Sequence, residues 1–268
     1  MIKVGIVGVG SIGTVLARRC VTQFREDVRL IGVVDHHKDR EKAVSRELGL
    51  KPGFTVPRLA RSVDLMIEAA SAAAAYPIAV EALSQGKDVM IMSSGGIVGK
   101  EKEIYRLARD HRCCVYLPSG AIAGIDALKS AAVGQIQSVS LVTRKAPRGF
   151  IGAPHVLRKK INLDRISKET LLFAGPAEKA IEGFPQNINV SATLSLAGIG
   201  PKKTSVKIYA CPGLSVHIHE VHVQGEFGSF YTRTENHPSR HNLKTSQLAV
   251  FSAVATLSRI LNNVKIGT

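Results

Sequence analysis

The sequence of 268 residues has no Trp, four Cys and only 5% aromatic residues. With so few aromatic side chains, a core must be built from Val, Ile, Leu and Ala, which favours an α/β fold with a parallel sheet over an aromatic-rich sandwich. The cysteines form no CxxC pair and lack metal-ligand spacing, so we expect neither a disulfide scaffold nor a metal site. No run approaches the roughly 18 apolar residues of a membrane span, so we expect no membrane association.

The N-terminal segment also lacks the pattern of a signal peptide. It contains one early Lys and a short apolar run, but glycines interrupt the run, and this is typical of a buried strand that leads into a loop. Together with the scarcity of cysteine, it predicts a reduced, cytoplasmic setting.

Acidic residues are scarce, with 21 Asp and Glu against 36 Lys and Arg, for a formal charge of +15. Residues 143–168 contain eight basic residues and a single acidic one, Asp164. The same segment has only one aromatic residue, Phe150, and no zinc or helix-turn-helix signature, so we expect no nucleic-acid partner. The segment is either a solvated face or a surface that steers a small anionic substrate.

The first half of the chain alternates between strand and helix patterns. Apolar runs predict strands at 2–7, 28–34, 64–69, 88–92 and 113–117, and helical spacing is found between them at 14–24, 40–48, 73–85 and 100–111. Such alternation requires crossover connections and a parallel sheet. We therefore expect a doubly wound Rossmann domain over residues 1–120.

After Pro118 the pattern changes to strands in succession. Strands are predicted at 138–143, 171–174, 205–210, 215–223 and 229–233, and helices at 125–133 and 187–197. We expect residues 121–242 to form an α+β domain with a mostly antiparallel sheet, used for substrate binding and oligomerisation. The last segment, 243–268, contains a helix predicted at 245–261 that packs back on the first domain.

A glycine-rich turn follows the first predicted strand: Gly8-Val9-Gly10-Ser11-Ile12-Gly13. In a nucleotide-binding βαβ unit, Gly8 permits the tight turn, Gly10 lets the backbone approach a pyrophosphate, and Gly13 allows close helix packing. Ser11 and Ile12 belong to the same turn, which leads into a helix whose N-terminus offers free N–H groups to the phosphates. The same pattern also occurs in plain glycine turns, so its position between strand and helix carries the prediction.

Asp35 ends the second strand, 22 residues after Gly13. It is placed to accept hydrogen bonds from the adenosine ribose, which favours NAD because a 2′-phosphate would face a carboxylate. His36, His37 and Lys38 follow directly, and these cations can accommodate the phosphate. We therefore expect the cofactor to be NAD or NADP.

Three histidines fall in the strand predicted at 215–223. Alternation places His217 and His219 on one face and His222 on the other. A pair at this spacing can bind zinc, but no third ligand is evident nearby, and a structural role is equally open. A catalytic histidine would polarise a carbonyl or move a proton near neutral pH.

Two further segments are candidates for ligand contact. Ser119 to Gly124, SGAIAG, lies at the carboxyl end of the last predicted strand of the first domain, where doubly wound sheets bind ligands. Asn187 and Asn189 stand at a predicted helix start, where capping explains Asn187 but less readily Asn189.

Longer motifs resemble those of one family, the L-aspartate dehydrogenases that use NAD or NADP. They are the GVGSIG turn, LPSGAIAGIDALKSA (117–131), TRKAP (143–147), FAGPAEKAIEGFPQNINVSATLSLAG (173–198), HEVHVQGEFG (219–228) and NLKTSQLAV (242–250). The resemblance covers essentially the whole chain. Two departures are Leu243, where the family usually has Pro, and a more basic, histidine-rich turn at 235–241.

The resemblance implies that His219 is the active-site histidine and that Ala121 and Asn189 contact the nicotinamide end of the cofactor. Arg144, Lys145 and Lys244 are candidates for binding the carboxylates of a dianionic substrate. The implied reaction converts L-aspartate through iminosuccinate to oxaloacetate and ammonia, or runs in reverse, with a place in pyridine-nucleotide biosynthesis. We expect a homo-oligomer, a dimer.

Two other functions stay open at this point. One is a nicotinamide-dependent oxidoreductase for another substrate, such as homoserine or a sugar, because the same two-domain plan supports several reactions. The other is a non-catalytic NAD-binding redox sensor whose basic face contacts nucleic acid. Turnover of L-aspartate would distinguish the family's reaction from both of these alternative functions.

Overall fold

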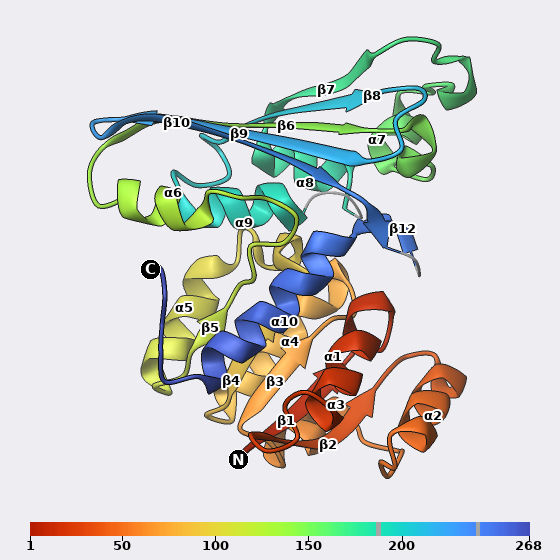
Figure 1. Cartoon of the computed structure of the whole chain (residues 1–268), viewed down its shortest axis with the longest axis vertical. Helices are drawn as coiled ribbons and strands as arrows, with labels where there is room; N and C mark the ends of the chain where they lie inside the picture. Colours follow the sequence, from red (N-terminus) through yellow and green to blue (C-terminus); the bar gives the residue numbers. More distant parts are fainter. Residues whose placement is uncertain (186–188, 240–241) are drawn as a thin grey trace. The chain divides into compact units, whose positions relative to one another are not determined.

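The structure is a computed structural model that describes residues 1–185, 189–239 and 242–268, without the side chains of 242–244. The chain divides into two compact units (Figure 1). The first contains Met1–Pro118 and Ala253–Val264, and the second contains Ser119–Ser252 and Lys265–Thr268. Each unit has a hydrophobic core of its own.

The first unit is built on a five-stranded sheet, in which all neighbouring strands are parallel, in the order β2-β1-β3-β4-β5. This is the expected doubly wound Rossmann arrangement. The strands are β1 (Ile2–Val7), β2 (Val28–Val34), β3 (Leu65–Glu68), β4 (Asp88–Ile91) and β5 (Val115–Tyr116). The helices are α1 (Ser11–Val21), α2 (Lys38–Glu47), α3 (Val56–Arg61), α4 (Ala72–Ser84), η1 (Ser94–Ile97) and α5 (Glu101–Asp110).

Two short elements of this unit were not predicted, α3 and the 3-10 turn η1. Both are too short for apolar periodicity to show them. Local chemistry accounts for the start of α3, since the Thr55 hydroxyl accepts a hydrogen bond from the Arg58 N–H and Pro57 occupies the first turn.

The glycine turn between β1 and α1 depends on two close backbone approaches. Gly8 has φ +94°, and a Cβ there would lie 2.5 Å from the backbone of Ala69 and Ala70. A Cβ on Gly13 would collide with the Gly8 carbonyl oxygen. Around Gly10, by contrast, a Cβ would meet no atom within 4 Å. The first and third glycines therefore shape the turn, and the second leaves space beside it.

The second unit has a mixed sheet in the order β10-β9-β6-β8-β7, parallel only between β6 and β8 among the described pairs. Its strands are β6 (Ile136–Lys145), β7 (Thr170–Pro176), β8 (Ser205–Ala210), β9 (His217–Gly225) and β10 (Gly228–Asn236), with a small pair formed by β11 (Pro238–Ser239) and β12 (Asn242–Ser246). Its helices are α6 (Ile125–Ala131), η2 (Pro147–Phe150), α7 (Pro154–Arg158), η3 (Leu163–Arg165), α8 (Ala177–Gly183) and α9 (Asn189–Ala197).

The helices α6, α8 and α9 lie on one face of this sheet, which we call the inner face (Figure 1). Leu128, Ala180 and Leu194 from these helices share a core with Leu141 of β6 and Val221 of β9. Strand alternation sends every second residue of each strand to this face. The inner face is therefore where side chains of β6, β9 and β10 become buried.

The last helix, α10 (Gln247–Leu261), begins two residues later than predicted because Thr245 and Ser246 still belong to β12. Its buried side chains include Val250, Ala253 and Leu257, a spacing of three and four residues. Ala253 and Leu257 are part of the core of the first unit. Phe251 lies off this buried face and is exposed.

Among residues 1–185, 189–239 and 242–268, we find no helix with both the length and the apolar character required to cross a membrane.

The two glycines of the turn should respond differently to the same substitution. Gly13→Ala should lower the free energy of unfolding by roughly 1–3 kcal/mol, because the backbone of the turn must move to admit the methyl group. Gly10→Ala should cost less than about 1 kcal/mol, the effect of a poorer N-cap. Urea denaturation of both variants measures the difference. Equal stabilities would show that the helix does not pack against the turn as closely as described.

Candidate active site

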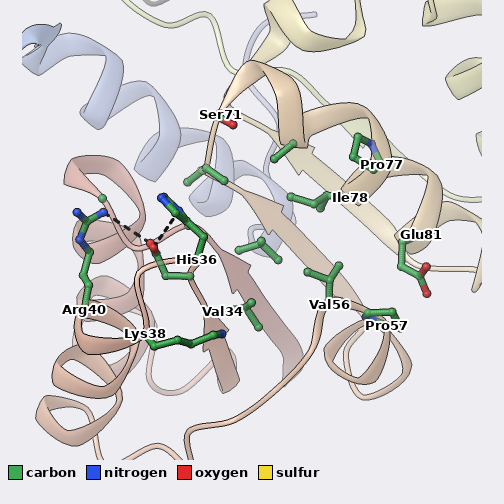
Figure 2. A pocket seen from close by; sticks show the side chains of 17 residues that line it. Val34, His36, Lys38, Arg40, Val56, Pro57, Ser71, Pro77, Ile78 and Glu81 are labelled. Atoms are coloured by element: carbon green, nitrogen blue, oxygen red, sulfur yellow. Dashed lines mark ion pairs between the residues drawn. The ribbon is translucent and has the colours of Figure 1, made fainter.

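A cavity of about 680 Å³ opens at the carboxyl ends of the parallel strands of the first unit (Figure 2). Its walls come from the glycine turn, the end of β2, the start of α3, the segment 69–71 after β3, and one side of α4. The order β2-β1-β3 places β1 and β3 at the point where the strand order reverses, and ligands of doubly wound sheets bind in that crevice.

Asp35 lies in the wall of this cavity and is only 4% exposed. Its carboxylate accepts hydrogen bonds of 2.8 Å from the backbone N–H groups of Val9 and His37. Burial by itself would raise the pKa of Asp35, but these two N–H groups and the nearby positive charges hold it below its usual value. The result is an ionised carboxylate that joins the end of β2 to the glycine turn.

Three basic side chains line the same cavity: His36, Lys38 and Arg40. The His36 imidazole lies 3.3 Å and the Arg40 guanidinium 3.8 Å from the Asp35 carboxylate (Figure 2). Lys38 instead pairs at 2.7 Å with Glu41, a buried carboxylate that also accepts the Asp35 N–H. The cavity thus presents a carboxylate and, beside it, cations that suit a phosphate.

The residues of this cavity fit a dinucleotide. Gly10 leaves open space at the N-terminus of α1, where no side chain caps the helix, so free N–H groups face that space. Gly8 and Gly10 line the cavity itself, while Ser11, Ile12 and Gly13 form the first turn of α1 behind it. This is the arrangement expected for pyrophosphate next to the glycines and ribose next to Asp35.

Glu68 is a residue that sequence reasoning missed. It ends β3, is fully buried, and accepts hydrogen bonds from the N–H groups of Ala70, Ser71 and Ser93 and from the Ser93 hydroxyl. Burial raises its pKa despite these bonds. Glu68 therefore fixes the segment that lines the cavity after β3. An acidic residue at the end of an otherwise apolar strand was the available signal.

In the second unit, polar side chains replace apolar ones at one end of the inner face. Thr143 of β6, His219 of β9 and Thr234 of β10 stand opposite one another, and His217 stands opposite Asn236 one step further. The Thr143 hydroxyl lies 3.0 Å from Nδ1 of His219. The Ser246 hydroxyl lies 3.1 Å from Nδ1 of His217. His222 points to the other face and is exposed, as the alternation predicted.

Lys145 ends β6 on this same inner face and is only 3% exposed. Its aliphatic stem passes beside Gly149 of η2, where a Cβ would stand 3.6 Å from it. Burial lowers the pKa of Lys145 to about 8. Burial, and then the neighbouring Lys145 and His217, lower the pKa of His219 well below its usual value, so this imidazole is neutral at physiological pH.

The segment 119–124 is hydrogen-bonded to β10 beside the cluster of Lys145, His217 and His219. The Ala121 carbonyl accepts hydrogen bonds from the Thr234 hydroxyl at 2.9 Å and from the Asn236 amide at 3.0 Å. The Thr232 hydroxyl donates to the Ala123 carbonyl at 3.1 Å. Alternate residues of β10 thus hold Ala121 next to the strand that carries His219.

The structure does not bring every predicted substrate residue to this cluster. Arg144 alternates to the opposite face, where its guanidinium lies 2.6 Å from Glu220 and 3.3 Å from Glu169. Asn189 is the first residue of α9. Lys244 belongs to β12, but its side chain lies outside the described residues, as does Asn187 altogether. Of the two candidate cations whose side chains are described, Lys145 is the one that the structure places with His219.

Within the described ranges, no group of three His, Cys, Asp or Glu side chains is arranged to hold a metal ion. The predicted pair His217 and His219 therefore has no third ligand of these types in the part of the chain that is described.

Comparisons with known proteins cover both units. Residues 8–118 match a family described as the NAD-binding domain of homoserine dehydrogenase. Residues 126–260 match a family described as the C-terminal part of aspartate dehydrogenase. The two matches correspond to the unit with the cavity beside the glycine turn and the unit with the histidine cluster.

Proteins that are similar over their whole length are L-aspartate dehydrogenases. The L-aspartate dehydrogenases of Methanosarcina acetivorans and Methanosarcina mazei are 46% and 44% identical, with complete coverage of both chains. Among solved structures, aspartate dehydrogenase from Thermotoga maritima matches with a TM-score of 0.73 and 26% identity over the whole of both chains. By these matches the chain belongs to the aspartate dehydrogenase family, and it is an NAD(P)-dependent amino-acid dehydrogenase.

Proposed function

We propose that the protein is an L-aspartate dehydrogenase that oxidises L-aspartate to iminosuccinate, which water converts to oxaloacetate and ammonia, and that it catalyses the reverse amination. The observation that carries the proposal is the burial of Lys145, His217 and His219 on one sheet face in a member of this family. A buried basic cluster suits a small dicarboxylate. The imine product could also serve as a precursor in pyridine-nucleotide biosynthesis.

The proposed cofactor site contains Gly8, Gly10, Ser11, Ile12, Gly13 and Asp35 for the pyrophosphate and adenosine ribose. Ala121 and Asn189 are proposed for the nicotinamide end, by resemblance to the family. When bound, NAD or NADP accepts the hydride that leaves Cα of the substrate. His36 and Arg40 support use of NADP as well as NAD, because both line the cavity beside Asp35.

In the proposed substrate site, His219 is the catalytic histidine and Lys145 binds a substrate carboxylate. Because His219 is neutral in the free protein, it acts as a hydrogen-bonding partner of the substrate and gains a proton only when negative charge approaches. Thr143 orients the ring through Nδ1. Arg144 stays in its ion pairs on the opposite face, and Lys244 remains a further candidate for the second carboxylate.

The proposal is tested by following the absorbance of reduced nicotinamide with both cofactors and a panel of amino and hydroxy acids. We expect turnover with L-aspartate and none with L-homoserine or sugars. Turnover with homoserine alone would assign the protein to another substrate. A complete absence of turnover, combined with salt-dependent retention on DNA, would favour the redox sensor.

His219→Ala should lower kcat/KM for L-aspartate by roughly 100-fold or more, the usual effect of removing a positioned acid–base or charge-stabilising group. NAD binding, measured by titration, should survive because the phosphate and ribose site belongs to the other unit. His222→Ala is the matched control, since this histidine is on the same strand but exposed on the opposite face. Near-wild-type turnover in the His219 variant would rule out the proposed catalytic role of His219.

Asp35→Ala should shift the ratio of kcat/KM for NAD to that for NADP towards NADP by about tenfold or more, the worth of a hydrogen bond to a charged group. The loss of the bonds to Val9 and His37 loosens the turn for both cofactors, so the ratio isolates the effect on the 2′ position. Arg40→Met is the control and should shift the ratio in the opposite direction. An unchanged ratio in Asp35→Ala contradicts the ribose assignment.

Lys145→Met should stabilise the protein at pH 7 by up to about 3 kcal/mol while reducing activity. Burial depresses the pKa of Lys145 from 10.5 to about 8, and each unit corresponds to about 1.4 kcal/mol. The free-energy cost of burying charged Lys145 is complete below pH 8, where Lys145 is protonated in both the folded and the unfolded state. The cost decreases as the pH rises towards 10.5, where Lys145 also loses its proton in the unfolded state. Urea denaturation across this range should show the two proteins converging. A variant less stable than wild type at pH 7 would contradict the burial cost.

We also propose that the protein forms a dimer through the outer face of the second unit's sheet. In the described part of the chain, the helices α6, α8 and α9 lie on the inner face (Figure 1). Tyr231 stands on the outer face of β10 and is 56% exposed. Beside it, Glu220 bridges Arg144 and Arg233 in a partly buried ion-pair network that is suited to an interface.

A further inference from the structure

Glu81 is a second carboxylate in the wall of the cavity, and the cofactor assignment above gives it no role. It lines the cavity from helix α4, together with Ala74, Pro77 and Ile78. Residues spaced by three and four positions lie on the same side of a helix, so this side of α4 forms one wall of the cavity. Glu81 is the polar residue at the end of that wall.

Glu81 and Asp35 belong to opposite ends of the cavity. His36, which pairs with the Asp35 carboxylate, lies at one end, and Glu81 lies at the other (Figure 2). Val34 and Val56 lie between these two ends (Figure 2). The cavity therefore leads from one carboxylate to the other across an apolar middle.

Three elements supply the apolar side chains of this middle part. They are Val34 at the end of β2, Val56 and Pro57 in the first turn of α3, and Pro77 and Ile78 of α4. Apolar walls favour an uncharged flat ring, whereas a phosphate or a sugar would lose hydrogen bonds to water there. Of the parts of a dinucleotide, a base is the one that suits this place.

The chemistry of the dinucleotide orders its parts in the same sequence. The adenine base is bonded directly to the ribose, which is assigned to Asp35. The amino group N6 is on the ring of the base that is more distant from the ribose. The order of ribose, base and amino group thus matches the order of Asp35, the apolar middle and Glu81.

The Glu81 carboxylate is held by one of its two oxygens. Its Oε1 accepts a hydrogen bond from the side-chain amide of Gln85, the residue that ends α4 one turn later. In the part of the chain that the structure describes, Oε2 takes part in no hydrogen bond or ion pair. The half-buried side chain is therefore positioned by its own helix and has an oxygen left for a donor.

A carboxylate accepts hydrogen bonds and, when ionised, cannot donate them. The N6 amino group of adenine donates, whereas hypoxanthine and guanine carry a carbonyl oxygen at the same position, which only accepts. Resting on the proposed cofactor site, we propose that Glu81 recognises the adenine base by accepting a hydrogen bond from N6. Glu81 thereby selects adenine dinucleotides over those that contain a 6-oxopurine.

A binding titration tests the inference on the full chain without any turnover. The probes are reduced NAD and reduced nicotinamide hypoxanthine dinucleotide, and the signal is the fluorescence of the dihydronicotinamide that both contain. We expect wild-type protein to bind the adenine dinucleotide tenfold or more tightly, the effect of a hydrogen bond to a charged group. Equal affinity for the two dinucleotides would overturn the recognition of N6.

Glu81→Gln assigns the preference to this side chain. An amide can accept from the amino group of adenine and can equally donate to the carbonyl oxygen of hypoxanthine. The preference for adenine should therefore fall to about unity, with weaker binding of reduced NAD and tighter binding of its hypoxanthine analogue. A wild-type ratio of affinities in this variant, with a melting temperature near that of wild type, would overturn the role of Glu81.

Glu103→Gln is the matched control. Glu103 of α5 is an exposed carboxylate that accepts a hydrogen bond from the Tyr76 hydroxyl of α4, so it also contacts this helix. Its variant should retain the wild-type ratio of the two affinities. An equal loss of preference in Glu103→Gln would show that the ratio depends on the helix in general, and would overturn the specific role of Glu81.

The two proposals fail separately. If wild-type protein turns over L-aspartate with NAD but binds both dinucleotides equally well, adenine recognition is overturned and the proposed function is unaffected. If it binds neither dinucleotide, the proposed cofactor site is overturned, and the recognition by Glu81 with it.

Discussion

The pairing register between β6 and β9 determines what chemistry the second unit contains. With Thr143 opposite His219, alternation sends Lys145, His217 and His219 to the inner face and sends Arg144 and Glu220 to the outer one. A slip of one residue would exchange the two sets, burying an ion pair and exposing the histidines. Val139, Leu141, Val221 and Val223 fix this register, because they fill the core along the same two strands. The apolar packing of the sheet therefore positions the polar cluster at its end.

In the first unit, two buried carboxylates organise the backbone around the cavity. Asp35 joins β2 to the glycine turn through the Val9 N–H, and Glu68 joins the segment after β3 to Ser93 after β4. Both are satisfied mainly by backbone N–H groups, which compensate for the cost of burial and fix loop geometry at the same time. The strand ends are thus held together by side chains, while the glycines leave the space that a dinucleotide requires.

Much of this architecture could be predicted from the sequence, because alternating strands and helices, the glycine turn and Asp35 each follow from local chemistry. The alternation of His217, His219 and His222 was also predicted. The sequence could not distinguish Arg144 from Lys145 as a partner of His219, since that depends on the pairing register and not on local pattern. Glu68 was missed because its role comes from loops distant in sequence. The short helices α3, α7 and α8 offered too little periodicity to be detected.

In the proposed reaction, a hydride leaves Cα of L-aspartate for the nicotinamide cofactor. The most direct measurement uses L-aspartate that carries deuterium at Cα, with mass spectrometry of the reduced cofactor. Deuterium should appear in the reduced nicotinamide, and oxaloacetate and ammonia should form in equal amounts. Reduced cofactor without deuterium, or no reduced cofactor at all with folded protein, would contradict the claim.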